Sequence, residues 1–166
     1  MGQVSDWRKW LAEHGPALAL LARQSVGNYA DAQDLVQEAF VRFWRRKNDA
    51  SDPAAYLYAC MRRCCLEWNR ASVRRQRREQ LGARTEQEPQ PGLFQQIADD
   101  ERRKTIEAAM QSLPAEQREV VIMRLWGGLS FPQIAQATEL SVDTVSSRYR
   151  YALQKLRSQL AQERVL

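Results

Sequence analysis

Apolar residues recur every three or four positions along most of the chain, and no stretch alternates apolar and polar residues as a half-buried strand does. Residues that favour helix starts precede several of these periodic stretches. The sequence therefore predicts an all-α fold. Helices are expected over residues 6–26, 31–46, 53–80, 97–112, 114–126, 131–138 and 142–161.

The segment 82–96 interrupts this pattern with two prolines, two glycines and few apolar residues, as a flexible linker does. The chain has 166 residues, of which 44% are hydrophobic, enough for two small cores. We therefore expect two small helical domains, residues 1–81 and 97–166, joined by the linker 82–96.

Positive charge is concentrated in the second half of the first domain and the first residues of the linker. Residues 42–84 hold twelve Arg or Lys against four acidic residues, in a chain whose net charge is +5. On the helix expected to start with Asp52 as N-cap and Pro53 at its first position, Arg70, Arg74 and Arg77 fall within about 40° of Arg63 on a helical wheel. Such a stripe is more than a solvated face needs, so we expect it to contact nucleic acid.

The other side of that helix carries Met61, Cys64, Cys65 and Trp68, so the thiols are expected to be core residues. With Cys60 as the third cysteine and His14 as the only histidine, the residues form no metal-site pattern. We expect no metal and no cofactor. The chain shows no signal peptide and no apolar run long enough for a bilayer, which predicts a cytoplasmic protein.

A helix-turn-helix unit is expected near the carboxyl end. Ser130 and Gln133 have the spacing of a capping box, Ser141 is a second N-cap, and a tight turn is expected near Glu139-Leu140. On the following helix, one face is apolar and the other carries side chains suited to base edges and phosphates. The apolar face comprises Val145, Tyr149, Ala152, Leu153 and Leu156; the outward face comprises Asp143, Ser147, Arg150, Tyr151 and Gln154, with Ser146 and Arg148 on its flanks.

Two sets of motifs resemble a known family. SLPAEQREV (112–120), GLSFPQIA (128–135) and SVDTVSSR (141–148) resemble sigma region four, and DAQDLVQEAF (31–40) resembles sigma region two. The chain is thus similar to extracytoplasmic-function (ECF) sigma factors of the sigma-70 family, which are not enzymes. The resemblance implies binding to core RNA polymerase, promoter recognition, DNA melting and transcription initiation.

The resemblance also implies three sets of site residues. Asp34, Gln37, Glu38 and Val41 would bind the β′ clamp of core RNA polymerase. Tyr56, Arg62, Arg63, Arg70, Arg74 and Arg77 would hold minus-ten promoter DNA. Ser146, Ser147, Arg148, Arg150 and Tyr151 would contact the minus-thirty-five element, in a domain that also docks on the β flap. The existence of a separate anti-sigma factor stays open.

Two departures from the family pattern bear on promoter choice. Arg63 lies about where relatives commonly have asparagine, and Ser146 replaces their usual basic residue. The preferred minus-ten and minus-thirty-five sequences of this chain therefore cannot be inferred from those of relatives.

Two other interpretations remain. A stand-alone helix-turn-helix regulator would explain the carboxyl half but leaves the arginine stripe without a role. A metal-dependent nuclease would use Asp31, Asp34 and Glu38 as ligands, but Asp31 is expected to be the N-cap of its helix.

Overall fold

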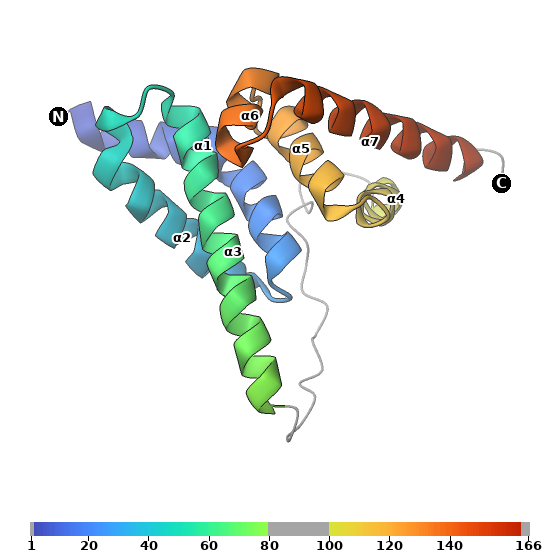
Figure 1. The fold of residues 1–166 in the computed structure, drawn as a ribbon, viewed down its shortest axis with the longest axis horizontal. Helices are drawn as coiled ribbons and strands as arrows, with labels where there is room; N and C mark the ends of the chain where they lie inside the picture. The colour runs from blue at the N-terminus through green and yellow to red at the C-terminus, as the bar shows by residue number, and fades with distance from the viewer. Residues whose placement is uncertain (1, 80–99, 164–166) are drawn as a thin grey trace.

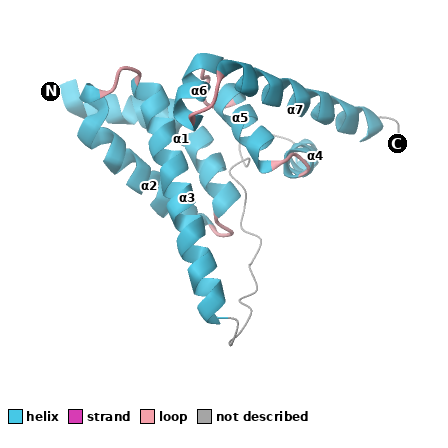
Figure 2. Cartoon of the chain, in the orientation of Figure 1, coloured by secondary structure: helices cyan, strands magenta, loops and turns pink. Residues whose placement is uncertain are grey.

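The computed structural model describes residues 2–79 and 100–163, and all regular structure in these two ranges is helical (Figure 2). The all-α prediction is confirmed. The first three helices are α1 (Gly2–Ser25), α2 (Tyr29–Arg46) and α3 (Pro53–Glu79), with the short 3₁₀ turn η1 (Lys47–Asp49) after α2. The remaining four are α4 (Asp100–Gln111), α5 (Ala115–Leu125), α6 (Phe131–Thr138) and α7 (Val142–Glu163).

Helix starts follow the capping chemistry of the sequence at three of the expected places. The Asp52 carboxylate accepts from the backbone N–H of Ala55 at 3.1 Å, and Ser141 Oγ accepts from Thr144 at 3.1 Å. Ser130 and Gln133 form the complete capping box at the start of α6. Glu139 closes α6 in the left-handed conformation, with φ of 58°, so the tight turn of the helix-turn-helix is confirmed.

The expected start of α2 is wrong. The N-cap is Asn28, whose extended backbone (φ −126°, ψ 157°) directs its side-chain oxygen to the N–H of Asp31. Asp31 therefore lies in the first turn of the helix, where its carboxylate complements the helix dipole. Asparagine and aspartate cap equally well, and Asn28 and Asp31 stand only three positions apart, so local propensity alone does not decide between them.

Helices α1, α2 and α3 pack around a first group of buried apolar residues and α4 to α7 around a second group, and both groups belong to one cluster. Phe43, Tyr58 and Met61 are fully buried in the first, and Val120, Ile134 and Val145 in the second. The carboxyl half of α3 extends beyond α1 and α2 (Figure 1). The predicted linker 82–96 lies outside the described residues, so the domain boundaries stay a prediction.

The two halves of the chain pack against each other. Helix α6 lies on α3, and α5 lies on α1 (Figure 1). The buried residues of both halves form one continuous cluster. We call this contact the seam, formed by Asp52, Tyr58 and Arg62 on one side and by Glu119, Gly127 and Gln133 on the other. The chain thus brings its two motif-bearing regions into direct contact.

Candidate nucleic-acid and polymerase interface

The outer face of α2 presents the residues expected to bind polymerase. Asp34, Gln37, Glu38 and Val41 are all exposed, and half of the Val41 surface reaches solvent. A contiguous exposed apolar patch rimmed by polar residues marks a protein-binding surface, and Val41 and Gln37 both line an apolar groove on this side of the molecule.

A network of ion pairs fixes this face relative to α3. Arg42 lies 2.5 Å from Glu38 in its own helix and 2.7 Å from Glu67 in α3. The hydrogen bond from Arg42 holds the pKa of the Glu67 carboxyl below its usual value. Arg42 therefore links the expected polymerase face to the arginine-rich helix.

Beside this face lies an apolar groove that sequence reasoning missed. It has a volume of about 820 Å³ and lies between α1 and α2. Its lining residues are Trp7, Leu11, Val36, Gln37, Phe40, Val41, Trp44 and Arg45. The sequence places two large apolar residues, Trp7 and Leu11, one helical turn apart, and this spacing is the signal that could have indicated the groove. In the structure these two residues are 42% and 41% exposed.

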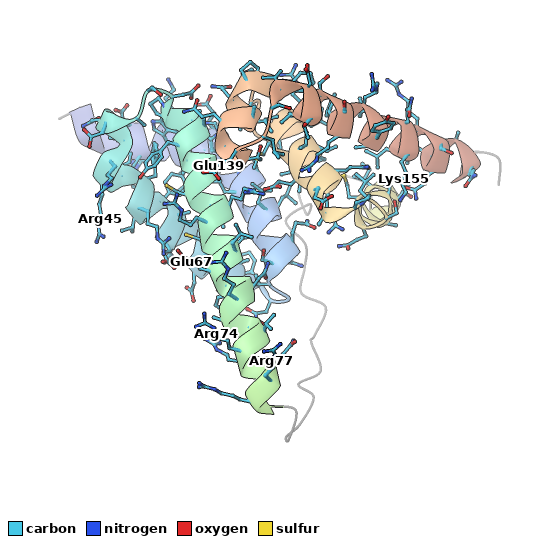
Figure 3. The ribbon with its side chains drawn as sticks, in the orientation of Figure 1. Arg45, Glu67, Arg74, Arg77, Glu139 and Lys155 are labelled. Atoms are coloured by element: carbon cyan, nitrogen blue, oxygen red, sulfur yellow. The ribbon has the colours of Figure 1, made fainter. Side chains whose placement is uncertain are left out.

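The arginine stripe of α3 reaches solvent as expected. Arg63, Arg70, Arg74 and Arg77 are exposed, and Arg74 and Arg77 project from the part of α3 that extends beyond the other helices (Figure 3). In the described part of the chain, no acidic group forms a salt bridge with these four residues. They form a cationic face, on which Glu67 lies close enough to Arg63 and Arg70 to interact with them electrostatically.

Arg62 differs from the other arginines in the minus-ten set. Its Nε donates to Glu119 Oε1 of α5 at 2.8 Å, and the two side chains are 31% and 19% exposed. Burial raises the pKa of Glu119, and the nearby Arg62 guanidinium opposes that rise. Arg62 is thus held at the seam in this conformation.

The aromatic residues near the stripe divide by burial. Tyr56 is half-buried, with its ring centroid 6.2 Å from that of Phe43, and burial raises the pKa of its phenol. Tyr58 is fully buried and cannot stack on a base. Trp68 is half-buried and lies 5.6 Å below the guanidinium of Arg75. Tyr56 and Trp68 therefore keep a surface that a base could reach.

Helix α7 has the two faces expected from its sequence. Val145 and Ala152 are buried, and Tyr149 packs on Phe131 with ring centroids 5.4 Å apart. Arg150 and Tyr151 are exposed, with the guanidinium 5.4 Å from the ring centroid. The other residues of the expected minus-thirty-five set, Ser146, Ser147 and Arg148, are half-buried.

The cysteines are core residues rather than reactive groups. Cys60 and Cys64 are buried and Cys65 is half-buried, and all are free thiols. Burial raises the pKa of Cys64 to about 12. Across the described residues, no three His, Cys, Asp or Glu side chains gather as a metal site would need. None of the described helices is both long and apolar enough to cross a membrane.

Comparison with known proteins gives matches over both halves of the chain. A family model for Sigma-70 region 2 matches residues 10–79, and one for Sigma-70, region 4 matches residues 103–156. The RNA polymerase sigma-E factor of Streptomyces coelicolor is 32% identical, over 96% of this chain and 89% of that protein. The ECF RNA polymerase sigma factor SigL of Mycobacterium tuberculosis is 31% identical, over 87% of this chain and 83% of its own length.

The fold also matches a solved structure. The sigma factor RpoE of Bartonella quintana, solved in complex with the anti-sigma factor NepR, superposes with a TM-score of 0.72 at 23% identity. The match covers 94% of this chain and 97% of that one.

Proposed function

The chain belongs to the sigma-70 family, as an ECF sigma factor that directs transcription initiation by RNA polymerase, and we propose that three of its surfaces divide this work. The exposed face of α2 binds the β′ clamp of core polymerase. The arginine stripe of α3 holds the unpaired minus-ten strand. The outward face of α7 reads the minus-thirty-five element, in a domain that also docks on the β flap.

The observation that carries this proposal is the cationic face of α3. Unpaired DNA presents a line of phosphates and open base faces, so a protein that holds it needs positive charge beside aromatic surfaces. Exposed Arg63, Arg70, Arg74 and Arg77 supply the charge, and half-buried Tyr56 is a candidate for stacking. No salt bridge with a described acid has to be broken before these four arginines meet phosphate.

Removing part of this charge tests the proposal. Arg70→Ala combined with Arg74→Ala should weaken promoter complexes formed with core polymerase. Each lost contact to a single strand lowers the slope of log affinity against log salt by about 0.7, so the double variant should lower it by about 1.4. The measurement is complex formation on a genomic promoter library at several salt concentrations.

The matched control is Arg8→Ala with Lys9→Ala, which removes the same charge from exposed positions of α1. It should leave the salt slope unchanged. Equal slopes for the wild type and the Arg70/Arg74 variant would contradict the assignment of this face to DNA.

A separate anti-sigma factor is part of the proposal, since the solved RpoE relative was captured with one. The test is to search for a protein that forms an equimolar complex with the purified chain. Such a protein should block the transcription that the chain directs with core polymerase. Cytoplasmic localisation follows from the same proposal, because polymerase and promoter DNA are there.

A further inference from the structure

One acidic residue interrupts the arginine stripe of α3. Glu67 is the only acid between Arg63 and Arg77, and it falls about 40° from Arg63 on the helical wheel, within the stripe itself. Arg63 lies four positions before it and Arg70 three positions after it, the two spacings at which side chains of a helix meet. A carboxylate in this place would be expected to pair with one of these two arginines.

The structure pairs Glu67 with a different arginine. Arg42 of α2 donates to both carboxylate oxygens, from Nη1 to Oε1 at 3.1 Å and from Nη2 to Oε2 at 2.7 Å, so Glu67 lies where α3 faces α2 (Figure 3). The pKa of its carboxyl is lowered chiefly by the hydrogen bond from Arg42 and further by the charges of Arg63 and Arg70. Among the described residues, no salt bridge joins Glu67 to either arginine of its own helix.

Arg42 is also held from its own helix. Its Nη2 donates to Glu38, one turn earlier on α2, at 2.5 Å. Carboxylates from two helices thus fix the guanidinium, and the bidentate pair with Glu67 requires the planar fork of donors that only arginine has. The side chains of Arg42 and Glu67 are 32% and 49% exposed, and ion pairs so exposed contribute little to folding stability. The effect of this pair should therefore appear in binding.

We propose that Arg42 is a positioning residue for minus-ten DNA: it occupies Glu67 and so leaves Arg63 and Arg70 free to meet phosphate. This inference rests on the proposed function, because it takes the arginine stripe to be the surface that holds the unpaired strand. Without Arg42, the Glu67 carboxylate would pair with the arginine before or after it on α3. One cation of the stripe would then be neutralised, and DNA binding would weaken by one phosphate contact.

A double-mutant cycle tests this role. Core polymerase is saturated with the full-length chain, so that a change in polymerase affinity does not enter, and the complex binds a promoter whose minus-ten region is held open by mismatches. Arg42→Ala should lower the slope of log affinity against log salt by about 0.7, the contribution of one phosphate contact to a single strand. At about 0.1 M salt this corresponds to about fivefold weaker binding.

The same substitution is then made in the Glu67→Gln background. There it should leave the slope unchanged, because the carboxylate that Arg42 occupies is already replaced by a neutral amide. The matched control is Lys9→Ala, which removes one positive charge from an exposed position of α1 and should not change the slope.

Two results would overturn the inference. An equal fall of the slope in both backgrounds would make Arg42 a phosphate contact itself, and no fall in either would leave it without a part in DNA binding. The melting temperature of each free variant shows whether it folds; if Arg42→Ala lowers it, Arg42→Gln makes the same test with a longer neutral side chain. Failure of the proposed function is seen separately, because the Arg70/Arg74 variant would then keep the wild-type slope.

Discussion

His14 is the only histidine in the chain, and only 5% of its surface is exposed. Its Nδ1 lies 3.0 Å from the Tyr58 hydroxyl, and its ring stacks on Trp10 with centroids 5.2 Å apart. Burial lowers the pKa of His14, and the charge of neighbouring Glu13 opposes this only in part. The folded protein therefore favours the neutral imidazole.

Stability should consequently fall as the solution becomes acidic. In the unfolded chain His14 binds a proton near its ordinary pKa of 6.5, whereas the folded protein binds it only at lower pH. The stabilising contribution is present above pH 6.5 and is lost as pH falls toward the lowered folded value. Thermal unfolding between about pH 7.5 and 5.5 should show this decline, and His14→Gln should reduce it.

Tyr58→Phe is the control for this titration, because it removes the hydrogen bond and keeps the imidazole. It should lower the melting temperature at every pH and retain the dependence on pH. A decline of the same size in His14→Gln would assign the acid sensitivity to other groups.

At the scale of elements, α7 combines a rigid inner face with an outer face free to meet DNA. Val145 and Ala152 anchor it on the core, and the Ser141 cap fixes its start. Arg150 is exposed in the third turn of α7, the second helix of the helix-turn-helix, and it is this second helix that enters the major groove in such units. Its guanidinium can donate to both acceptors of a guanine edge.

Arg150→Ala should therefore change which minus-thirty-five sequences are preferred. A lost bidentate contact to guanine costs about 1 to 3 kcal/mol at that base and little elsewhere. Initiation measured with core polymerase across a randomised minus-thirty-five library should show relaxed preference at one position. Arg157→Ala, which removes an exposed arginine further along α7, should leave the ranking unchanged. A uniform loss on every sequence would identify Arg150 as a phosphate contact instead.

At the scale of the whole molecule, promoter-specific transcription should require core polymerase. The free chain should bind promoter duplex weakly, because Arg62 of the proposed minus-ten set is already paired with Glu119 at the seam. Gln37→Ala with Glu38→Arg should reduce affinity for core polymerase, since it removes an amide and reverses a charge on the exposed face of α2. Affinity is measured by titrating labelled protein with core polymerase in the absence of DNA.

Glu116→Arg is the matched control for this variant, because it makes the same charge change at an exposed position of α5, outside the α2 face and its ion pairs. It should leave polymerase affinity near that of the wild type. Tight, sequence-specific binding to duplex DNA without polymerase would favour a stand-alone regulator.

The sequence by itself determined the features that depend on residues close together in the chain. Caps at Asp52, Ser130 and Ser141, and the inner stripe of α7 around Val145, were predicted correctly because each involves groups within about one or two helical turns. The two family motifs were recognised for the same reason, since each is a short continuous segment. The start of α2 was wrong because Asn28 and Asp31 are equally good local caps.

Only the tertiary structure decided how distant residues meet. Arg62 and Glu119 are 57 positions apart, and nothing in the periodicity of either helix shows that they form a pair. Trp7 and Phe40 line one groove only because α1 and α2 pack side by side, and Gly127 contacts Tyr58 only because α6 lies on α3. Helical periodicity determines which face of a helix is buried, but the crossing of two helices depends on how all the apolar faces fit together.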